Sequence, residues 1–318
     1  MQSGIGPHLS QGTHYGDTSV VTDVTDFIFQ ITPTDKPFFH LCDDKPASVN
    51  APYHQWQYRA LNVRQVNANL EGFNYTFTNP SRLPSRVANV LQILAKDIRI
   101  SNTNQAIGHY AIPNMRADQV ETQLAELGTD IEHALLRSTM ATGASGVART
   151  MAGIMPMIVS AGSLYTTASG TTLSETRFNA FLEDGYSAGA ALKDVLVDPR
   201  MKRAISNFTA NIARVINADE HRVTNSIDVY DSEYGPVNTH ISRDIPNFFG
   251  GLSLARGLLF VDKSQIAKAW LRTVGVKRTA DIADSEDYIA ACELTLEYGH
   301  PLAHLYVSHI YSGILNTP

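Results

Sequence analysis

The residues best suited to bind a metal lie close together near the C-terminal end of the chain. Glu297, His300, His304 and His309 carry the carboxylate and imidazole groups that zinc takes as ligands, and bound zinc would support a hydrolase. The local pattern, however, predicts a strand, a turn and a second strand, which point the four side chains in different directions. Pro301 also prevents a helix that would align two of the histidines. We therefore interpret them as residues at a hairpin end and on a strand face, and we expect no metal.

Two groups of neighbouring carboxylates are candidates for acid–base catalysis or for calcium binding. They are the pair Asp43 and Asp44 and the acidic run Asp281, Asp284, Glu286 and Asp287. The run lacks the Asp-x-Asp-x-Asp-Gly order that arranges oxygen ligands around calcium. Both groups are interpreted as solvated acidic turns.

Motifs that mark common catalytic and cofactor sites are missing from the sequence. It contains no Gly-x-x-x-x-Gly-Lys phosphate loop, no Gly-x-Gly-x-x-Gly dinucleotide motif and no Gly-x-Ser-x-Gly nucleophile turn. The segment Gly143-Ala144-Ser145-Gly146 comes nearest to a nucleophile turn, but its glycines are misplaced, so it predicts the end of a helix and a loop. We expect no catalytic residues and no cofactor.

The composition narrows the class of protein. The 318 residues include 25 Lys and Arg against 31 Asp and Glu, a net charge of −6, which disfavours a basic face for nucleic acid phosphates. Charged residues make up 18% of the chain, below the roughly 25% of an average soluble domain, so we expect polar surface in contacts with other chains. Cys42 and Cys292 are too few for a disulfide framework. No targeting signal or membrane-spanning apolar stretch is visible.

The first third of the chain predicts an arm, a short helix and a projecting hairpin. Residues 1–22 are rich in Gly, Ser, Thr and His and predict an arm that becomes ordered only against another part of an assembly. Apolar residues at helical spacing predict a short helix over residues 24–31. Strands are predicted over residues 53–61 and 86–100, and residues 63–85 between them predict a projecting hairpin.

The clearest element is a long helix in the middle of the chain. Apolar or small residues recur at spacings of three and four from Ala117 to Ala141 and predict one narrow buried stripe that ends at Gly143. Its Ala and Ser positions favour a helix across a sheet over a coiled coil. Further helices are predicted over residues 175–186 and 199–208 with a buried strand over residues 195–197 between them, and residues 190–280 predict a mixed α/β unit. Cys292, Leu294 and Leu296 alternate with polar residues and predict a strand with one buried face, which belongs to a long closing β-hairpin predicted over residues 285–310.

Short motifs along the chain carry a family resemblance through their shared order. They are Ile31-x-Pro33-x-Asp35-x-Pro37-Phe38, the strand around Trp56, Ile98-Arg99-Ile100-Ser101-Asn102-Thr103, Val195-Leu196-Val197-Asp198-Pro199, Tyr230-x-Ser232-x-Tyr234-Gly235 and Glu293-Leu294-Thr295-Leu296. Together with the arm, the hairpin and the long helix, this order resembles the major capsid proteins of tailed double-stranded DNA phages, which have the Hong Kong 97 (HK97-like) fold. Arg59 departs from the pattern, in which an acidic residue follows the tryptophan.

The resemblance implies an α+β, HK97-like capsid fold in five parts. These are an N-terminal arm over residues 1–50, an extended β-hairpin loop over 51–112, a peripheral domain with a long spine helix over 113–189, an axial α/β domain over 190–284, and C-terminal strands of the peripheral domain over 285–318.

The resemblance also implies a structural function without catalysis. Copies of the chain are expected to form pentamers and hexamers of an icosahedral shell that encloses packaged double-stranded DNA. The shell would be a virion capsid assembled in the host cytoplasm, with portal, scaffold and decoration proteins as partners, and with no membrane and no sequence-specific nucleic acid. Two alternatives stay open: an encapsulin-like nanocompartment with an enzyme cargo, and a cytosolic metal-dependent hydrolase.

Charge is unevenly divided in the front of the chain, which suggests contacts between subunits. Residues 1–50 hold six acids and two bases, whereas residues 51–112 hold six bases and two acids. In the implied fold the extended loop reaches over an adjacent subunit. The candidate intersubunit contacts are therefore Arg64, Arg82 and Arg86 on the loop and Asp43 and Asp44 on the neighbour.

The composition of the extended loop bears on covalent cross-linking. Some capsids of this fold join subunits by an isopeptide bond from a loop lysine to a neighbour's asparagine. Residues 63–85 contain two arginines and no lysine, and a guanidinium stays protonated and is a poor nucleophile. The sequence therefore predicts a non-covalent shell.

Overall fold

The fold is seen in a computed structural model that describes most of the chain. The described residues are 34–45, 49–61, 64, 66, 68–74, 83–108, 112–161, 164–168, 171–208, 228–245, 256–280 and 283–311. The predicted arm over residues 1–22 and the predicted helix over residues 24–31 lie outside them. Within the described ranges, no helix has both the length and the apolar character needed to cross a membrane.

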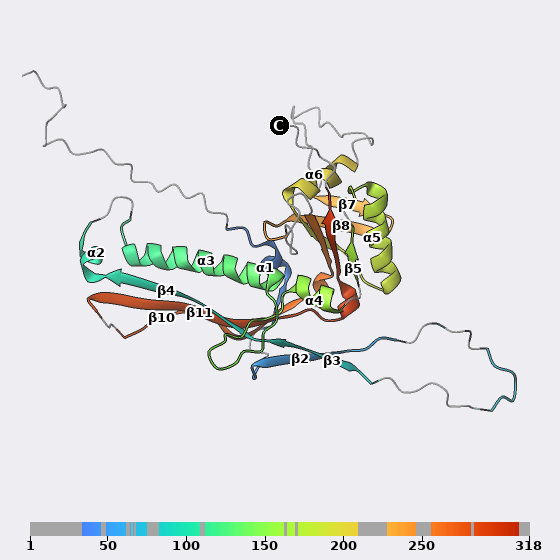
Figure 1. Cartoon of the computed structure of the whole chain (residues 1–318), viewed down its shortest axis with the longest axis horizontal. Coiled ribbons are helices and arrows are strands. Elements are labelled where there is room, and N and C mark those ends of the chain that lie inside the picture. Colours follow the sequence, from blue (N-terminus) through green and yellow to red (C-terminus); the bar gives the residue numbers. More distant parts are fainter. Residues whose placement is uncertain are drawn as a thin grey trace, which may run out of the picture.

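Two sheets and a separate hairpin make up the architecture (Figure 1). The four-stranded sheet, in spatial order, contains β1 (Asp43–Lys45), β10 (Ala267–Arg278), β11 (Ser285–Glu297) and β4 (Gln92–Ser101). The six-stranded sheet contains β5 (Tyr165–Thr167), β12 (Leu305–Ile310), β9 (Arg256–Val261), β6 (Asp194–Val197), β8 (Gly235–Ile241) and β7 (Val229–Ser232). The hairpin pairs β2 (Tyr53–Tyr58) with β3 (Ser85–Val90).

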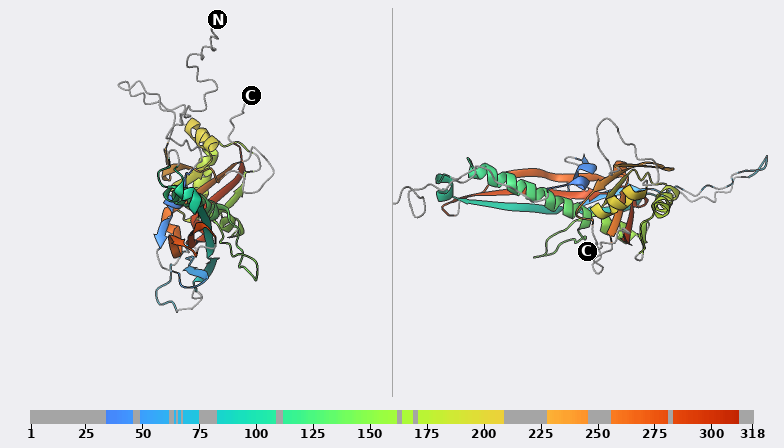
Figure 2. Two further views of the ribbon diagram at one scale, coloured as in Figure 1. Left: turned by 90° about the vertical axis from the view of Figure 1, so that its left-hand side faces the viewer. Right: turned by 90° about the horizontal axis from the view of Figure 1, so that it is seen from above.

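The helices cover the two sheets. They are α1 (Pro37–Leu41), α2 (Asn102–Ala106), α3 (Met115–Arg137), α4 (Ile154–Ala161), α5 (Glu175–Ala188) and α6 (Pro199–Phe208), with short 3₁₀ turns at Lys263–Gln265 and Pro301–Ala303. Figure 2 shows α3 running along the strands of the four-stranded sheet, while α5 and α6 belong to the six-stranded sheet. This mixture of helices and strands confirms the predicted α+β class.

Helix α3 is the predicted long helix, and its buried stripe packs on the four-stranded sheet. Asn114 begins it, because its side-chain oxygen accepts hydrogen bonds from the backbone N–H groups of Arg116 and Ala117 at 3.1 and 3.2 Å. Leu127, Ile131 and Leu135 recur every four residues and are all buried. The helix therefore lies across a sheet, as the weak Ala and Ser positions predicted.

The predicted end of this helix at Gly143 was wrong. The helix ends at Arg137, because Ser138 turns to an extended conformation with ψ of 138°. The carbonyl of Ser138 instead accepts a hydrogen bond from the N–H of Gly153 at 2.7 Å. A Cβ atom on Gly153 would lie 2.6 Å from the backbone of Leu136, so this close return of the chain requires glycine.

Strand β11 places an apolar face under α3. Cys292, Leu294 and Leu296 are fully buried and alternate along the strand, as predicted. They share one core with Phe38 of α1 and with the buried stripe of α3. One face of the four-stranded sheet is thus covered by α3 together with α1.

The predicted closing β-hairpin was also wrong. Strand β11 already lies between β10 and β4, so it has no free edge for a return strand. Strand β12 instead enters the six-stranded sheet, where it pairs antiparallel with β9 and parallel with β5. Each sheet therefore combines strands from before and after residue 284, because β10 pairs with β11 and β12 pairs with β9.

The six-stranded sheet is covered on both faces. Val195 and Val197 of β6 face α5 and α6, whereas Leu196 faces the core that contains α3 and α4. Strand β6 is parallel to β8, and α6 follows β6 directly. The predicted helices over residues 175–186 and 199–208 and the strand between them are therefore confirmed.

Candidate functional site

The hairpin that carries the extended segment is fixed at its root by aromatic contacts. We use "extended segment" for residues 59–84, between β2 and β3. The indole Nε1 of Trp56 donates a hydrogen bond to the carbonyl of Gly299 at 2.8 Å, and its ring stands edge-on to Tyr298 at 5.3 Å. Tyr58 packs against His300 with ring centroids 4.9 Å apart. These contacts tie β2 to the turn that follows β11.

A carboxylate of that turn joins three strands by ionic contacts. Glu297 lies 2.8 Å from Nε2 of His54 and 2.7 Å from Nζ of Lys45. The hydrogen bond with His54, and then Lys45, lowers the pKa of Glu297 below its ordinary value, although partial burial opposes this. The two contacts of Glu297, with His54 and with Lys45, link β1, β2 and β11 at the root of the hairpin.

Asn89 fastens the second strand of the hairpin to the interior. It is fully buried, and its Nδ2 donates to the carbonyls of Ala152 and Leu296 at 3.0 and 2.9 Å. Its Oδ1 accepts from the N–H groups of Ala152 and Val90 at 2.9 and 2.8 Å. The side-chain amide therefore makes two hydrogen bonds as a donor and two as an acceptor, which is its full capacity. The signal in the sequence was an asparagine inside a strand, a position that asparagine normally avoids.

Beyond this root, the extended segment exposes large apolar side chains. Leu61, Val66, Leu70 and Leu83 are 87%, 97%, 85% and 85% exposed. Large apolar side chains that are almost fully exposed on one segment gain stability when another molecule covers them. Among the residues that the structure describes, the fixed root and the exposed apolar side chains beyond it make this hairpin a candidate to contact another molecule.

The structure describes four of the five candidate intersubunit residues, and these four differ in their contacts within the subunit. Arg64 and Arg86 are exposed and form no ion pair with the residues that the structure describes, whereas Arg82 lies outside the described residues. Asp43 is exposed on β1. Asp44 is engaged within its own chain, where it accepts a hydrogen bond from Nε1 of Trp270 at 2.8 Å and lies 3.3 Å from Nζ of Lys268.

A buried polar cluster under α1 was not predicted from the sequence. The carboxylate of Glu132 in α3 accepts hydrogen bonds from the N–H groups of Phe38 and Phe39 at 2.9 and 2.6 Å. Burial raises the pKa of Glu132 to about 7, although these two N–H groups oppose the shift. Lys268 is also buried, and its Nζ donates to the carbonyl of Phe39 at 2.6 Å. The cluster anchors the start of the described chain to α3 and β10.

The four metal-ligand candidates do not meet. Glu297 is engaged at the hairpin root, and Nδ1 of His300 accepts from the N–H of Leu302 at 3.1 Å. His304 is buried, its Nε2 donates to the carbonyl of Tyr298, and burial lowers its pKa to about 4. Among the described residues, no group of three or more His, Cys, Asp or Glu is arranged to hold a metal ion.

The acidic run after β10 is likewise occupied by contacts within the chain. Asp287 makes a bidentate pair with Arg99, with both distances at 2.8 Å. Glu286 accepts a hydrogen bond from the hydroxyl of Tyr288 at 2.6 Å, which lowers the pKa of Glu286. Asp281 lies outside the described residues. These carboxylates are ion-pair partners and turn residues rather than converging ligands.

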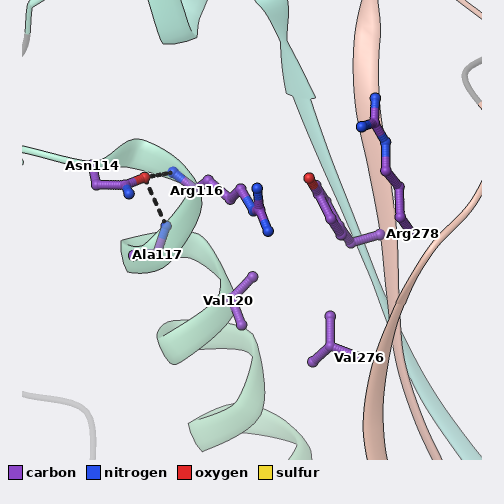
Figure 3. Close-up of a pocket in the computed structure, with 7 residues that line it drawn as sticks. Asn114, Arg116, Ala117, Val120, Val276 and Arg278 are labelled. Carbon is purple, nitrogen blue, oxygen red and sulfur yellow. Dashed lines mark hydrogen bonds between the residues drawn. The ribbon is translucent and has the colours of Figure 1, made fainter.

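A groove lies between the first turn of α3 and strand β10 (Figure 3). It has a volume of about 680 Å³ and is lined by Asn114, Arg116, Ala117, Val120, Val276, Arg278 and Tyr288. The guanidinium of Arg116 lies 4.9 Å from the ring centroid of Tyr288, and Arg278 lies 3.7 Å from Glu286. The lining residues provide no paired nucleophile and base, so the groove has no catalytic arrangement.

Solved structures that are similar to this chain include phage capsids and an encapsulin complex. The chain is similar to the capsid of Cyanophage A-1(L), with a TM-score of 0.66 and 11% identity over 94% of this chain and 99% of that one. It is also similar to the capsid of Cyanophage P-SCSP1u (TM-score 0.61, 12% identity, 94% of each chain). A third similar structure is the holo-SrpI encapsulin complex from Synechococcus elongatus (0.58, 10%, 94% and 95%). The chain therefore has the HK97-like fold.

The family model described as "SU10 major capsid protein" matches residues 9–311. The chain belongs to this family, and its role is that of a structural, shell-forming protein of a phage capsid. No curated protein sequence matches it. The resemblance stated from the sequence motifs is thus confirmed, as is the predicted fold class.

Proposed function

We propose that copies of this chain assemble into pentamers and hexamers of an icosahedral virion shell that encloses packaged double-stranded DNA, and that the chain has no catalytic activity. The observation that carries the proposal is the match of the capsid family to residues 9–311. The exposed apolar side chains of the extended segment support it, because they need a partner to cover them. Assembly in the host cytoplasm, with portal, scaffold and decoration proteins, is part of the same proposal.

The five-part division predicted from the sequence is proposed with this function. Residues 1–50 would form the N-terminal arm, 51–112 the extended loop, 113–189 the peripheral domain, 190–284 the axial domain and 285–318 the C-terminal strands. The fixed root and exposed apolar segment of the hairpin support the part assigned to the extended loop.

Contacts between neighbouring subunits are proposed to involve the extended loop. Arg64, Arg82 and Arg86 would meet acids of an adjacent subunit. Asp43 is the better acidic candidate, because Asp44 already binds Trp270 and Lys268 in its own chain.

An encapsulin-like shell is the second candidate, favoured by the similarity to the Synechococcus elongatus encapsulin over nearly the whole of both chains. The two functions predict different contents, namely packaged DNA or an enzyme cargo.

Purification of the chain followed by sedimentation and negative-stain electron microscopy tests the proposal. The expected result is megadalton shells or rings of subunits, and particles from phage lysates are expected to contain DNA. A stable monomer under all assembly conditions, together with no virion that contains the chain, would refute a capsid function. Shells filled with an enzyme instead of DNA would support the encapsulin alternative.

A further inference from the structure

Two exposed tyrosines stand beside a hollow at one end of the six-stranded sheet. Tyr186 near the C-terminal end of α5 is 66% exposed, and Tyr234 at the turn between β7 and β8 is 39% exposed. Their ring centroids lie 5.4 Å apart. Beside them, Leu182, Leu192 and Pro236 help to line a hollow of about 330 Å³. Exposed aromatic rings next to a hollow are typical anchors of protein interfaces.

Two acidic side chains lie next to this tyrosine hollow, which is defined by Tyr186, Tyr234 and the lining residues. Glu183 in α5 and Glu233 in the turn are exposed, and both are close enough to Tyr234 to contribute, after burial, to its raised pKa. Neither carboxylate forms an ion pair within the described part of the chain. Lys193 is the basic residue in the lining. The hollow is therefore largely apolar, and two carboxylates near Tyr234 outnumber the one ammonium group in the lining.

Helix α6, at the other end of strand β6, presents the opposite charge. Residues 190–193, which line the hollow, lead directly into β6, and α6 begins two residues after β6 ends. Figure 1 shows α6 at the top of this sheet and α5 along its right-hand side. Arg200 and Arg203 are exposed on α6, while Met201 is buried beneath them. Neither arginine has an ion-pair partner among the residues that the structure describes.

We propose that the tyrosine hollow of one subunit receives Arg200 and Arg203 of an adjacent copy of this chain, and that this contact closes rings of subunits. The inference rests on the proposed shell function, which supplies the second copy. Arginine suits the hollow, because its guanidinium both pairs with carboxylates and stacks on aromatic faces.

The signs of the two surfaces determine the symmetry of the contact. A two-fold contact of hollow with hollow would place acids against acids, and a contact of α6 with α6 would oppose arginines. Opposite charges meet only when the tyrosine hollow of one subunit contacts α6 of the other. Such a contact joins different surfaces of two identical subunits, and contacts of this kind generate rings when the rotation closes.

Charge exchange tests the proposal. One variant combines Glu183→Arg with Glu233→Arg, and the other combines Arg200→Glu with Arg203→Glu. Each is expected to lose the rapidly sedimenting assemblies that wild type forms at the same concentration and salt, with an unchanged circular dichroism spectrum. The fourfold variant, which carries both exchanges, keeps complementary surfaces and is the matched control. It is expected to assemble again.

An equal mixture of the two double variants gives a sharper result. Each variant supplies the surface that the other lacks, so the mixture is expected to associate although neither variant does so alone. The two must alternate around a ring, so a ring of six closes and a ring of five does not. Electron microscopy is therefore expected to find sheets or tubes without closed shells.

The outcomes separate this inference from the proposed function. Double variants that assemble as wild type does, or a folded fourfold variant that stays unassembled, would overturn the contact while leaving the shell function intact. Failure of wild type itself to form shells or rings would instead overturn the proposed function.

Discussion

The buried carboxylate of Glu132 predicts a measurable pH dependence of folding stability. This side chain is 1% exposed and is held by the N–H groups of Phe38 and Phe39, with Lys268 and Asp244 as the charged groups that act on it. Replacement of Glu132 by Gln removes the titration and keeps the size of the side chain. The quantity of interest is the difference in unfolding free energy between wild type and this variant as the pH changes.

The sign follows from the direction of the pKa shift. Burial raises the pKa of Glu132 from 4.5 to about 7 in the folded state, so between these values the folded protein binds a proton that the unfolded chain releases. Its contribution to stability is fully present below pH 4.5 and is lost as the pH rises toward 7. At about 1.4 kcal/mol for each pH unit, the loss is about 3 kcal/mol.

Urea unfolding of dilute, unassembled protein at several pH values between 4.5 and 8 tests this, with the fluorescence of Trp56 and Trp270 as the signal. Wild type is expected to lose about 3 kcal/mol more than Glu132→Gln over this range. Subtraction of the two curves removes the titration of groups that both proteins share. Parallel curves for the two proteins would refute the reasoning, because they would mean that Glu132 is ionised throughout the range.

Three further predictions concern the hairpin and its extended segment. Asn89→Ala leaves the buried N–H groups of Val90 and Ala152 without the Asn89 acceptor, so it is expected to destabilise the subunit by about 3 kcal/mol in urea unfolding. The control Asn207→Ala, at an exposed position, is expected to change the unfolding free energy little. Arg82→Glu combined with Arg86→Glu is expected to weaken assembly at low salt without unfolding the subunit, and assembly equal to wild type would mean that these charges are bystanders. Boiled particles are expected to give single subunits on a denaturing gel, so a ladder of covalent multimers would contradict a non-covalent shell.

Local patterns in the sequence were sufficient for most individual elements. The spacing of three and four residues that runs through Leu124, Leu127 and Ile131 predicted the long helix, and the alternation of Cys292 and Leu294 predicted a strand with one buried face. Both patterns are direct consequences of helix and strand geometry. They are readable without knowledge of what lies opposite them.

Pairing between distant elements was harder to predict. The alternation in β11 and β12 is the same whether the strands form a hairpin or enter different sheets, since only the partner differs. The end of α3 depended on Gly153, which lies sixteen residues beyond Arg137 and allows the chain to return against the helix end. Single-sequence patterns contain no information on such contacts.

The polar groups that hold the hairpin and α1 were missed for the same reason. Glu132 occupies a helix position next to other acids in the sequence, where a solvated face is the normal expectation. It is buried because Phe38 and Phe39, more than ninety residues away, direct their N–H groups at it. Asn89 gave a weak warning as a polar residue inside a strand, but its four partners come from three separate parts of the chain.

The root of the hairpin is fixed by contacts within the subunit, whereas the extended segment leaves apolar side chains exposed to a partner. At the root, Trp56 and Asn89 satisfy their polar groups within the subunit, so the direction in which the hairpin leaves the body does not depend on a partner. Farther out, Leu61 and Val66 remain almost fully exposed. Burying each of these side chains against another subunit is worth about 2 kcal/mol, and a fixed root reduces the entropy lost when the hairpin docks. Weakening the root should therefore reduce assembly even where every side chain at the contact is unchanged.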